Sequence, residues 1–480
     1  MASSEPFALW NLEQEGRALL SRLGRLQSFA LQETMVPAAS LSVEAQSGIE
    51  KFLVRGRKSL RQQIHRFLDW IKSPAARATS PADAQRRFTL LRLRFNVILS
   101  HFDIFSEALS QRSEADNGVW LAGLDVVARD ALEVPGVIDP PPVICYLARG
   151  PGAAIRRART RLPGGESNPV AIIRVPRERM IGTGIASSLV HEVGHQGAAL
   201  LDLVASLRAD LLHPPPHIAA ADGFDNGNVD ASVAVPRAGA DWAWSVWRKW
   251  ISEIVADFWS VARLGVTATS GLIGVVSLPA AFVFRIDADD PHPSPYLRVK
   301  LSAALGNALY PHPHWGRLTR MWESFYDVGR LPPVQRERFA QLEATMPALV
   351  ERLLAHRSPR LGHATLAQAL ADRGRRPEPL AALYRAWQAR PAELGRAAPT
   401  LAFAVLGQAR LDGRLSPELE SELLARLLKH WAWRATVDVT EVCAVARRGS
   451  HLPPSPPSSP IWLRSPVATA LAPPAGAANH

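Results

Sequence analysis

Residues 189–195 read Leu-Val-His-Glu-Val-Gly-His, and the pattern H-E-x-x-H within them decides much of the expected fold. On a helix, His191 and His195 are one turn apart on the same face, so two imidazole nitrogens can reach one metal ion. Glu192 lies beside the first histidine, where a carboxylate can take a proton from the attacking water. Apolar residues surround the motif and predict a largely buried helix, where these polar groups are costly unless a metal binds them. The alternative is a buried helix whose polar groups satisfy one another.

A catalytic zinc ion needs a third protein ligand. Residues 250–259 read W-I-S-E-I-V-A-D-F-W and predict a second helix, with Glu253 and Asp257 one turn apart. Because most other positions are apolar or aromatic, we expect Glu253 to bind the metal and Asp257 to orient a ligand histidine. The alternative is a solvated helix face with two ordinary acids. In that case His213 and His217, from a proline-rich loop, are the fallback ligands.

H-E-x-x-H followed on a second helix by E-x-x-x-D resembles the gluzincin zinc metallopeptidases, the group of thermolysin and neprilysin. Residues 290–299 read D-P-H-P-S-P-Y-L-R-V and resemble the stretch of the neprilysin family in which arginine follows histidine by six residues. The resemblance implies that His292 stabilises the oxyanion, that Arg298 holds a substrate carbonyl or carboxylate, and that Asp290 orients His292. A proline-rich surface loop with an incidental histidine is the alternative. The chain lacks a recognisable N-A-x-Y/F edge-strand motif.

The predicted function is therefore hydrolysis of peptide bonds in a peptide or protein substrate by a zinc metallopeptidase. One catalytic Zn²⁺ is expected, with His191, His195 and Glu253 as its ligands. Glu192 is the expected general base, because it can take a proton from water and return it to the leaving amine. The alternative from another class is a non-catalytic binding or assembly protein with a zincin-like fold. A membrane-bound peptidase is a third possibility.

The composition of the 480 residues, 47% hydrophobic and 21% charged, is typical of a globular protein. The net charge is +11, but arginine far outnumbers lysine, and no dense basic run carries interleaved aromatic residues. The densest run, residues 156–161, alternates and predicts a strand with one basic face, so a nucleic-acid partner is not expected. Cys145 and Cys443 are too few for a disulfide framework. The N-terminus shows no secretory signal, and we expect a cytoplasmic protein.

Residues 264–284 carry no charge and are long enough to span a bilayer. Several glycines and Pro279 interrupt the segment, and the arginines flanking it are symmetrical and give no orientation signal. The segment also separates Glu253 from His292, which must meet at one metal ion. We therefore expect buried core behind the site and no membrane contact.

The predicted fold class is α+β and predominantly helical, with a zincin-like catalytic domain that contains a small antiparallel sheet. Strands are expected at 143–148, 154–162 and 170–175, with 170–175 as the edge to which a peptide adds. The four tryptophans of residues 242–250 are attributed to core packing, and His312 and His314 to a turn. The expected regions are an N-terminal helical region 1–134, a metallopeptidase domain 135–332, a C-terminal helical region 333–447 and a disordered tail 448–480. A protein partner is possible through the C-terminal helices or the Pro-rich tail.

Overall fold

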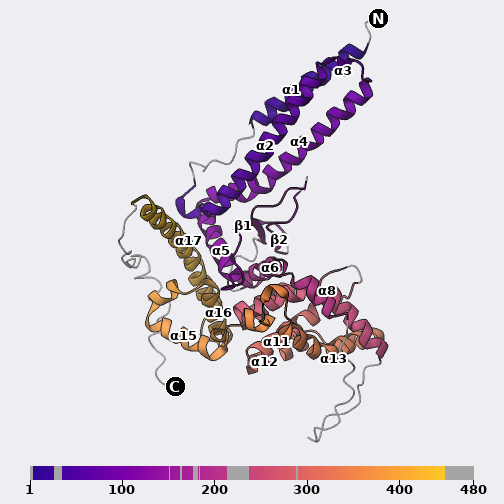
Figure 1. Ribbon diagram of the computed structural model, residues 1–480. Helices are drawn as coiled ribbons and strands as arrows, with labels where there is room; N and C mark the ends of the chain where they lie inside the picture. Colours follow the sequence, from indigo (N-terminus) through magenta and orange to yellow (C-terminus); the bar gives the residue numbers. More distant parts are fainter. Residues whose placement is uncertain are drawn as a thin grey trace, which may run out of the picture.

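The computed structural model describes residues 4–25, 35–150, 152–162, 165–176, 182, 184–212, 237–287 and 290–448 (Figure 1). It is predominantly helical with one small mixed sheet, so the predicted fold class is confirmed at that level. His213, His217 and the tail from residue 449 lie outside the described residues. Among the described residues, six short 3₁₀ helices connect the longer elements: η1 (Pro37–Ala39), η2 (Gln111–Ser113), η4 (Val328–Arg330), η5 (Pro359–Leu361), η6 (Arg373–Arg375) and η7 (Pro391–Arg396).

The N-terminal helices form an elongated arm that projects from the rest of the molecule (Figure 1). Serine caps begin its two longest helices: Ser42 accepts a hydrogen bond from the backbone of Ala45, and Ser80 from that of Asp83. Its apolar core is rich in phenylalanine residues. Their rings pack against each other between the two longest helices, as in the pairs Phe52–Phe105 and Phe67–Phe88. The arm elements are α1 (Ser4–Arg25), α2 (Val43–Ile71), α3 (Pro74–Arg77) and α4 (Pro81–Ser110).

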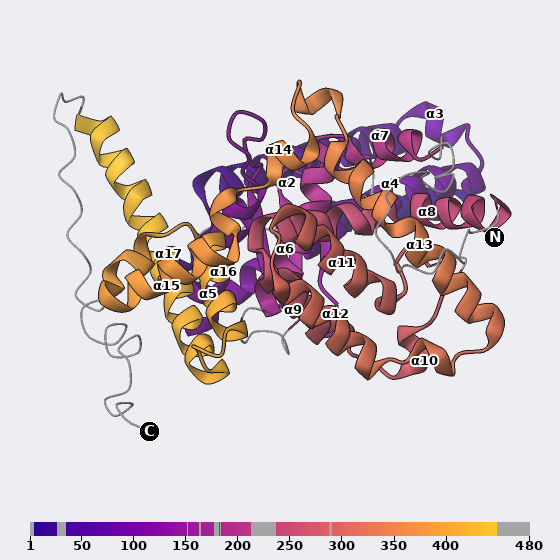
Figure 2. The same cartoon turned by 90° about the horizontal axis from the view of Figure 1, so that it is seen from below.

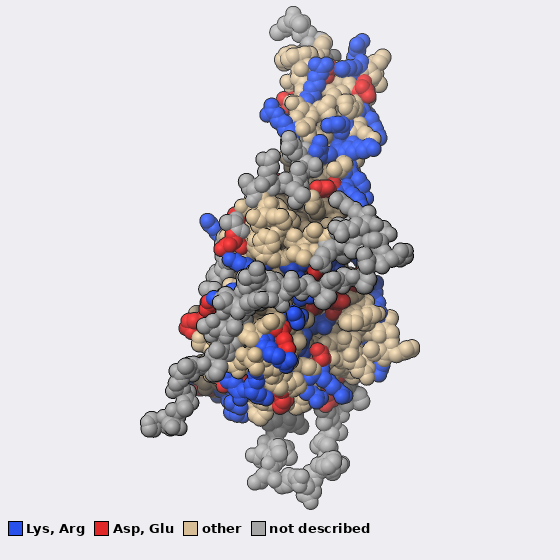
Figure 3. Space-filling model, turned by 90° about the vertical axis from the view of Figure 1, so that its left-hand side faces the viewer, with Lys and Arg blue, Asp and Glu red and all other residues tan. Residues whose placement is uncertain are grey.

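Positive charge gathers on this arm. No acidic residue occurs between Glu50 and Asp69 in α2, or between Asp83 and Asp103 in α4, whereas both stretches are rich in arginine. Figure 3 shows Lys and Arg side chains over the visible face of the arm. Part of the chain's net positive charge therefore lies on the arm, apart from the predicted metal site.

The three strands, β1 (Val143–Ala148), β2 (Ala154–Arg156) and β3 (Ala171–Pro176), form a sheet in the order β1-β3-β2. β1 and β3 are parallel, while β2 and β3 are antiparallel, so the prediction of an antiparallel sheet is wrong for one of the two pairs. The prediction that the third strand forms the edge is also wrong, because β3 lies in the middle. Its first three residues, Ala171–Ile173, are apolar and buried, as in a strand covered on both faces, and Arg174 interrupts the apolar run.

The sheet separates two apolar clusters. Ile144 and Ile172 pack into the core of the arm, whereas their neighbours Cys145 and Ile173 point into the main core. This alternation follows from the two-residue period of a strand. The middle strand therefore has no free edge, and the predicted strand 154–162 contributes only the short β2, whose second edge has no strand partner among the described residues.

The central helices are α5 (Ala115–Leu132), α6 (Gly184–Leu200), α7 (Leu203–Asp210), α8 (Arg237–Leu264), α9 (Val266–Val276), α10 (Ala280–Val283), α11 (Pro295–Leu309) and α12 (Pro313–Phe325). The helix with the H-E-x-x-H motif, α6, packs against α8 and α9, and α11 packs against both of these helices. Figure 2 shows α6, α9, α11 and α12 in the centre of the molecule. Trp247 and Trp250 on α8 are fully buried, which confirms core packing for them. His312 caps α12 rather than joining a metal cluster.

The segment 264–284 forms α9 and α10, and α9 packs against α6 directly behind the motif. Most residues of α9 are buried, which confirms the expectation of core packing there. Residues 277–282 are exposed, including Leu278 and Phe282, so the expectation of buried core is wrong for this part of the segment. None of the described helices is both long and apolar enough to cross a membrane.

The C-terminal helices share the main core with α6 and α8, so both predicted regions contribute to one apolar cluster. Eight of the described α-helices begin at a proline, whose fixed φ and missing N–H suit a first helical position. This position accounts for some of the chain's prolines, including Pro417 at the start of the last helix. The C-terminal elements are α13 (Pro333–Ala355), α14 (Leu366–Leu370), α15 (Pro377–Ala389), α16 (Pro399–Leu411) and α17 (Pro417–Arg448).

Candidate metal centre

Two glycines let the helices that carry the expected ligands approach closely. A Cβ added to Gly194, inside the motif on α6, would lie 2.8 Å from Cα of Ala256 on α8. A Cβ on Gly197 would lie 2.4 Å from the ring of Trp259. Both distances are far below van der Waals contact, so only glycine permits this crossing. The crossing places His191 and His195 opposite Glu253.

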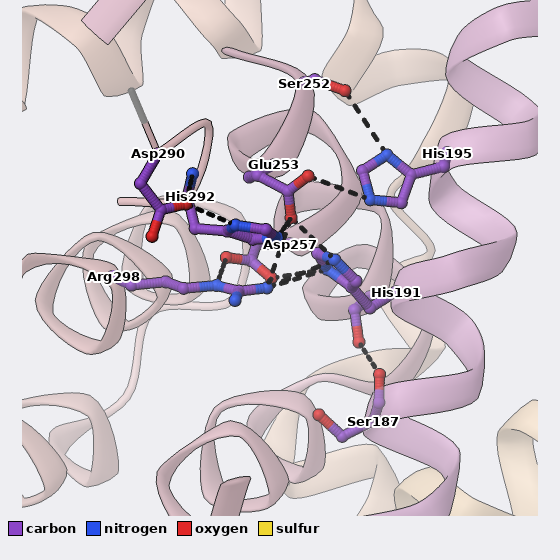
Figure 4. Close-up of polar contacts among 10 residues, drawn as sticks. Ser187, His191, His195, Ser252, Glu253, Asp257, Asp290, His292 and Arg298 are labelled. Carbon is purple, nitrogen blue, oxygen red and sulfur yellow. Dashed lines mark hydrogen bonds and ion pairs between the residues drawn. The ribbon is translucent and has the colours of Figure 1, made fainter. Parts of the chain in front are cut away.

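The structure brings these three residues together as a group positioned to bind a metal ion. One ligand atom from each lies within 4.8 Å of the others. Nε2 of His191 is 3.2 Å from Oε2 of Glu253, and Nε2 of His195 is 3.4 Å from Oε1 (Figure 4). Both Nε2 atoms therefore face the same carboxylate. Two imidazoles and one carboxylate form a common ligand set for catalytic zinc, so the residues fit this metal.

The Nδ1 atoms of the two histidines face other partners. Nδ1 of His191 lies 2.8 Å from Oδ1 of Asp257, and Nδ1 of His195 lies 3.5 Å from the hydroxyl of Ser252. A proton on Nδ1 that is donated to Asp257 leaves Nε2 of His191 free as an acceptor. Asp257 thus contacts His191 as predicted from the sequence.

Arg298 binds Asp257 from the other side. Its Nε donates to Oδ2 at 2.6 Å and its Nη2 donates to Oδ1 at 2.8 Å, which is a two-point contact (Figure 4). Nη2 also lies 3.2 Å from Nδ1 of His191. Arg298 stands in the first turn of α11, at the start of the predicted helix. The sequence suggested a contact with substrate, and the structure adds this contact with a carboxylate of the protein.

Electrostatics holds this group in a charged state when no metal is bound. Burial is the largest single effect and favours neutral His191, but the attraction of Asp257 and the hydrogen bonds of Asp257 and Glu253 together outweigh it and raise the pKa of His191 to about 9. Burial also favours neutral Asp257, yet Arg298 and then His191 outweigh it and lower the pKa of Asp257 to about 2. The pKa of Glu253 is held far below its usual range despite burial, by hydrogen bonds from His191 and His195.

Glu192 faces the same cavity, and Arg298 interacts with its carboxylate electrostatically. The cavity has a volume of about 440 Å³ and is lined by Glu192 together with all three ligand residues. No hydrogen bond or ion pair of the Glu192 carboxylate occurs among the described residues. Such a carboxylate, next to the ligands and open to the cavity, is available to accept a proton.

His292 lies at the mouth of the cavity, close to the ligands. Its Nε2 is 3.8 Å from Oε2 of Glu253, although its side chain is 56% exposed. Asp290 accepts hydrogen bonds from the backbone N–H of His292, at 2.9 Å, and contacts Nδ1, at 2.7 Å. Asp290 therefore holds the ring with Nε2 directed toward the site (Figure 4). The structure thus brings all eight predicted site residues to one place.

Several lining residues were not predicted from the sequence. The loop before β2 and the strand itself form one wall, α9 contributes Leu272 and Val275, and Arg157 follows β2. The sequence predicted a basic strand over 156–161, but the strand ends at Arg156 and Arg159 adopts a positive φ of 64°. The run of arginines in residues 156–161 was the sequence feature that could have indicated this wall, because the run packs beside α6.

Comparison of the chain with known protein families, with characterised proteins and with solved structures found no match. Any function inferred for the site therefore rests on its geometry alone. Two histidines, one carboxylate, a free glutamate and an anchored imidazole meet at one cavity.

Proposed function

We propose that the protein is a zinc-dependent peptidase. The observation that carries this proposal is the convergence of His191, His195 and Glu253 beside the free carboxylate of Glu192. Zinc bound by the three ligands would polarise a carbonyl and lower the pKa of water toward roughly 7. Glu192 accepts a proton from the attacking water and donates it to the leaving amine.

Substrate is proposed to lie along β2. Within the described part of the chain, this strand pairs with β3 on one side only, and residues 152–155 line the cavity with the metal group. A peptide that adds to such an edge receives main-chain hydrogen bonds, which position its carbonyl groups. The docking strand is thus β2 and not the strand expected from the sequence.

His292 is proposed to donate a hydrogen bond from Nε2 to the developing oxyanion, with Asp290 as its positioning residue. Arg298 retains Nη1, for which no contact occurs among the described residues, to meet a substrate carbonyl. We expect His292→Ala to lower kcat by about 10²- to 10³-fold with little change in KM or zinc content. Wild-type kinetics in this variant would exclude the role.

The decisive experiment compares wild type with Glu192→Gln, using zinc analysis and cleavage of a mixed peptide library. We expect the variant to keep its zinc and to lose hydrolysis, because Glu192 is a base and not a ligand. Glu351→Gln, an exposed change on α13, is the matched control and should behave as wild type. Zinc binding by wild type without any peptide cleavage would favour the alternative of a non-catalytic metal-binding protein.

A further inference from the structure

The two ends of the cavity differ in chemistry. Ser187 and Ser188 lie one turn before the first metal-binding histidine, and α9 closes this end with Leu272 and Val275. The hydroxyl of Ser187 donates to the backbone carbonyl of Ala268 at 2.9 Å, which fixes α9 against α6. Apolar and small side chains at this end suit an apolar side chain of a substrate.

The opposite end is basic. Arg157 lines the cavity there, and its position is fixed by its neighbour Ala158, whose N–H donates to the buried side chain of Gln196 at 2.8 Å. Gln196 directly follows His195 on α6. Arg157 therefore lies beside the second metal-binding histidine, while Leu272 and Val275 lie beside the turn before the first one.

Arg157 differs from the other cations of the cavity because its charge is not compensated locally. Arg298 is bound by Asp257, and His292 by Asp290. No ion pair of the exposed Arg157 occurs among the described residues. A guanidinium beside a peptide-binding edge is well suited to a carboxylate, which it can bind through two parallel hydrogen bonds.

The length of α6 sets the distance between the two ends. Ser187 and Gln196 are nine positions apart on this helix, which corresponds to about 13 Å at a rise of about 1.5 Å per residue. An extended peptide covers this distance with about four residues, at about 3.3 Å each. A short peptide can therefore reach both ends while one of its bonds lies at the metal group.

We propose that the site selects peptides in which a carboxylate binds Arg157 and an apolar side chain occupies the end formed by Leu272 and Val275. This selectivity rests on the proposed function, in that the cavity binds peptides. The carboxylate belongs either to an Asp or Glu side chain or to the C-terminus of the substrate.

The test measures binding of fluorescein-labelled peptides of about eight residues to the zinc-loaded Glu192→Gln protein, which binds without cleaving. The peptides carry one leucine, and about four residues away either glutamate or glutamine, with the C-terminus free or amidated. Adding Arg157→Gln should weaken binding of a carboxylate peptide by about 10- to 100-fold and leave the uncharged peptide unchanged. The peptide pair that shows this loss identifies the carboxylate source.

Arg156→Gln is the matched control. Arg156 is the exposed last residue of β2 and directly precedes Arg157, but it interacts electrostatically with Tyr146, which packs against the core of the arm on the other face of the sheet. This change should leave all affinities unaltered. Equal losses for charged and uncharged peptides, no loss, or no peptide binding at all would overturn the inference.

Failure of the proposed function gives a different result. If wild type cleaves no peptide while binding still depends on Arg157 and a carboxylate, the selectivity stands without hydrolysis. If wild type cleaves peptides with no preference for a carboxylate, the function stands and the selectivity is wrong.

Discussion

Replacing Arg298 with methionine tests whether the buried pair with Asp257 supports the metal centre. The side chains of Arg298 and Asp257 are only 12% and 9% exposed, and their closest atoms are 2.6 Å apart. Removing one partner of a buried ion pair typically costs about 3–5 kcal/mol, because the other charge stays buried. His191 remains 2.8 Å from Asp257 and compensates part of its charge. The free energy of unfolding of the metal-free protein should therefore fall by an amount toward the lower end of this range, about 3 kcal/mol.

The matched control is Arg390→Met, which breaks an exposed pair of similar length. Arg390 and Glu393 lie 2.7 Å apart, with side chains 68% and 37% exposed. An exposed pair contributes about 0–1 kcal/mol, so burial alone separates the two expected losses. Combining Arg298→Met with Asp257→Asn should recover part of the loss, since no carboxylate then remains buried without a cation.

Urea denaturation followed by tryptophan fluorescence measures these differences. Trp247, Trp250 and Trp259 are buried in the same cluster as the metal helices and report on its unfolding. A loss below about 1 kcal/mol for Arg298→Met, equal to the control, would refute the reasoning. The same outcome combined with a raised KM would assign Arg298 to substrate binding alone.

Three further changes probe the site. Glu253→Ala should abolish zinc binding, whereas Asp257→Asn should weaken zinc affinity about 10- to 100-fold in a chelator competition; equal small effects would place the third ligand elsewhere. The proton on His191, whose raised pKa is about 9, competes with the metal, so zinc affinity should keep rising up to about pH 9. In Asp257→Asn the zinc affinity should stop rising at a lower pH, because Asp257 no longer raises the pKa of His191. Identical pH profiles of zinc affinity in the two proteins would contradict this. Gly197→Leu should lower thermal stability, because its side chain meets the ring of Trp259; an unchanged melting temperature would show that the helices separate freely.

The group positioned to bind a metal ion was predictable because the spacing and the surroundings of its residues agree. His191 and His195 repeat with the period of a helix, and Glu253 stands in an apolar segment where a carboxylate needs a partner. Both the spacing of the histidines and the apolar surroundings of Glu253 can be recognised within about ten consecutive residues of the sequence. The segment 264–284 was assigned to the core by a similar argument, since its two ends had to meet at one site.

The errors and the missed contacts concern relations between distant segments. The apolar residues of β3 indicate burial, but which strand lies at the edge depends on pairing that is not encoded locally. The contact of Arg298 with Asp257, which the sequence did not reveal, joins residues 41 positions apart on two helices, and arginine suits a carboxylate of substrate or of protein equally well. The sequence could not distinguish Arg157 from the other arginines of residues 156–161, because only the folded structure shows that it lines the cavity.

The shared core has a consequence for how this protein can be divided or altered. Glu253 stands on α8, and α8 packs against α13 and α16 as well as against α6. The indole N–H of Trp247 on α8 donates to the hydroxyl of Thr345 on α13 at 2.8 Å. A fragment that ends at residue 332 would expose this surface of α8 to solvent. We therefore expect that the fragment 135–332 does not fold into a working metal site without the C-terminal helices. We also expect that destabilising substitutions in α13 or α16 weaken metal binding, because these helices pack against the helix that carries Glu253.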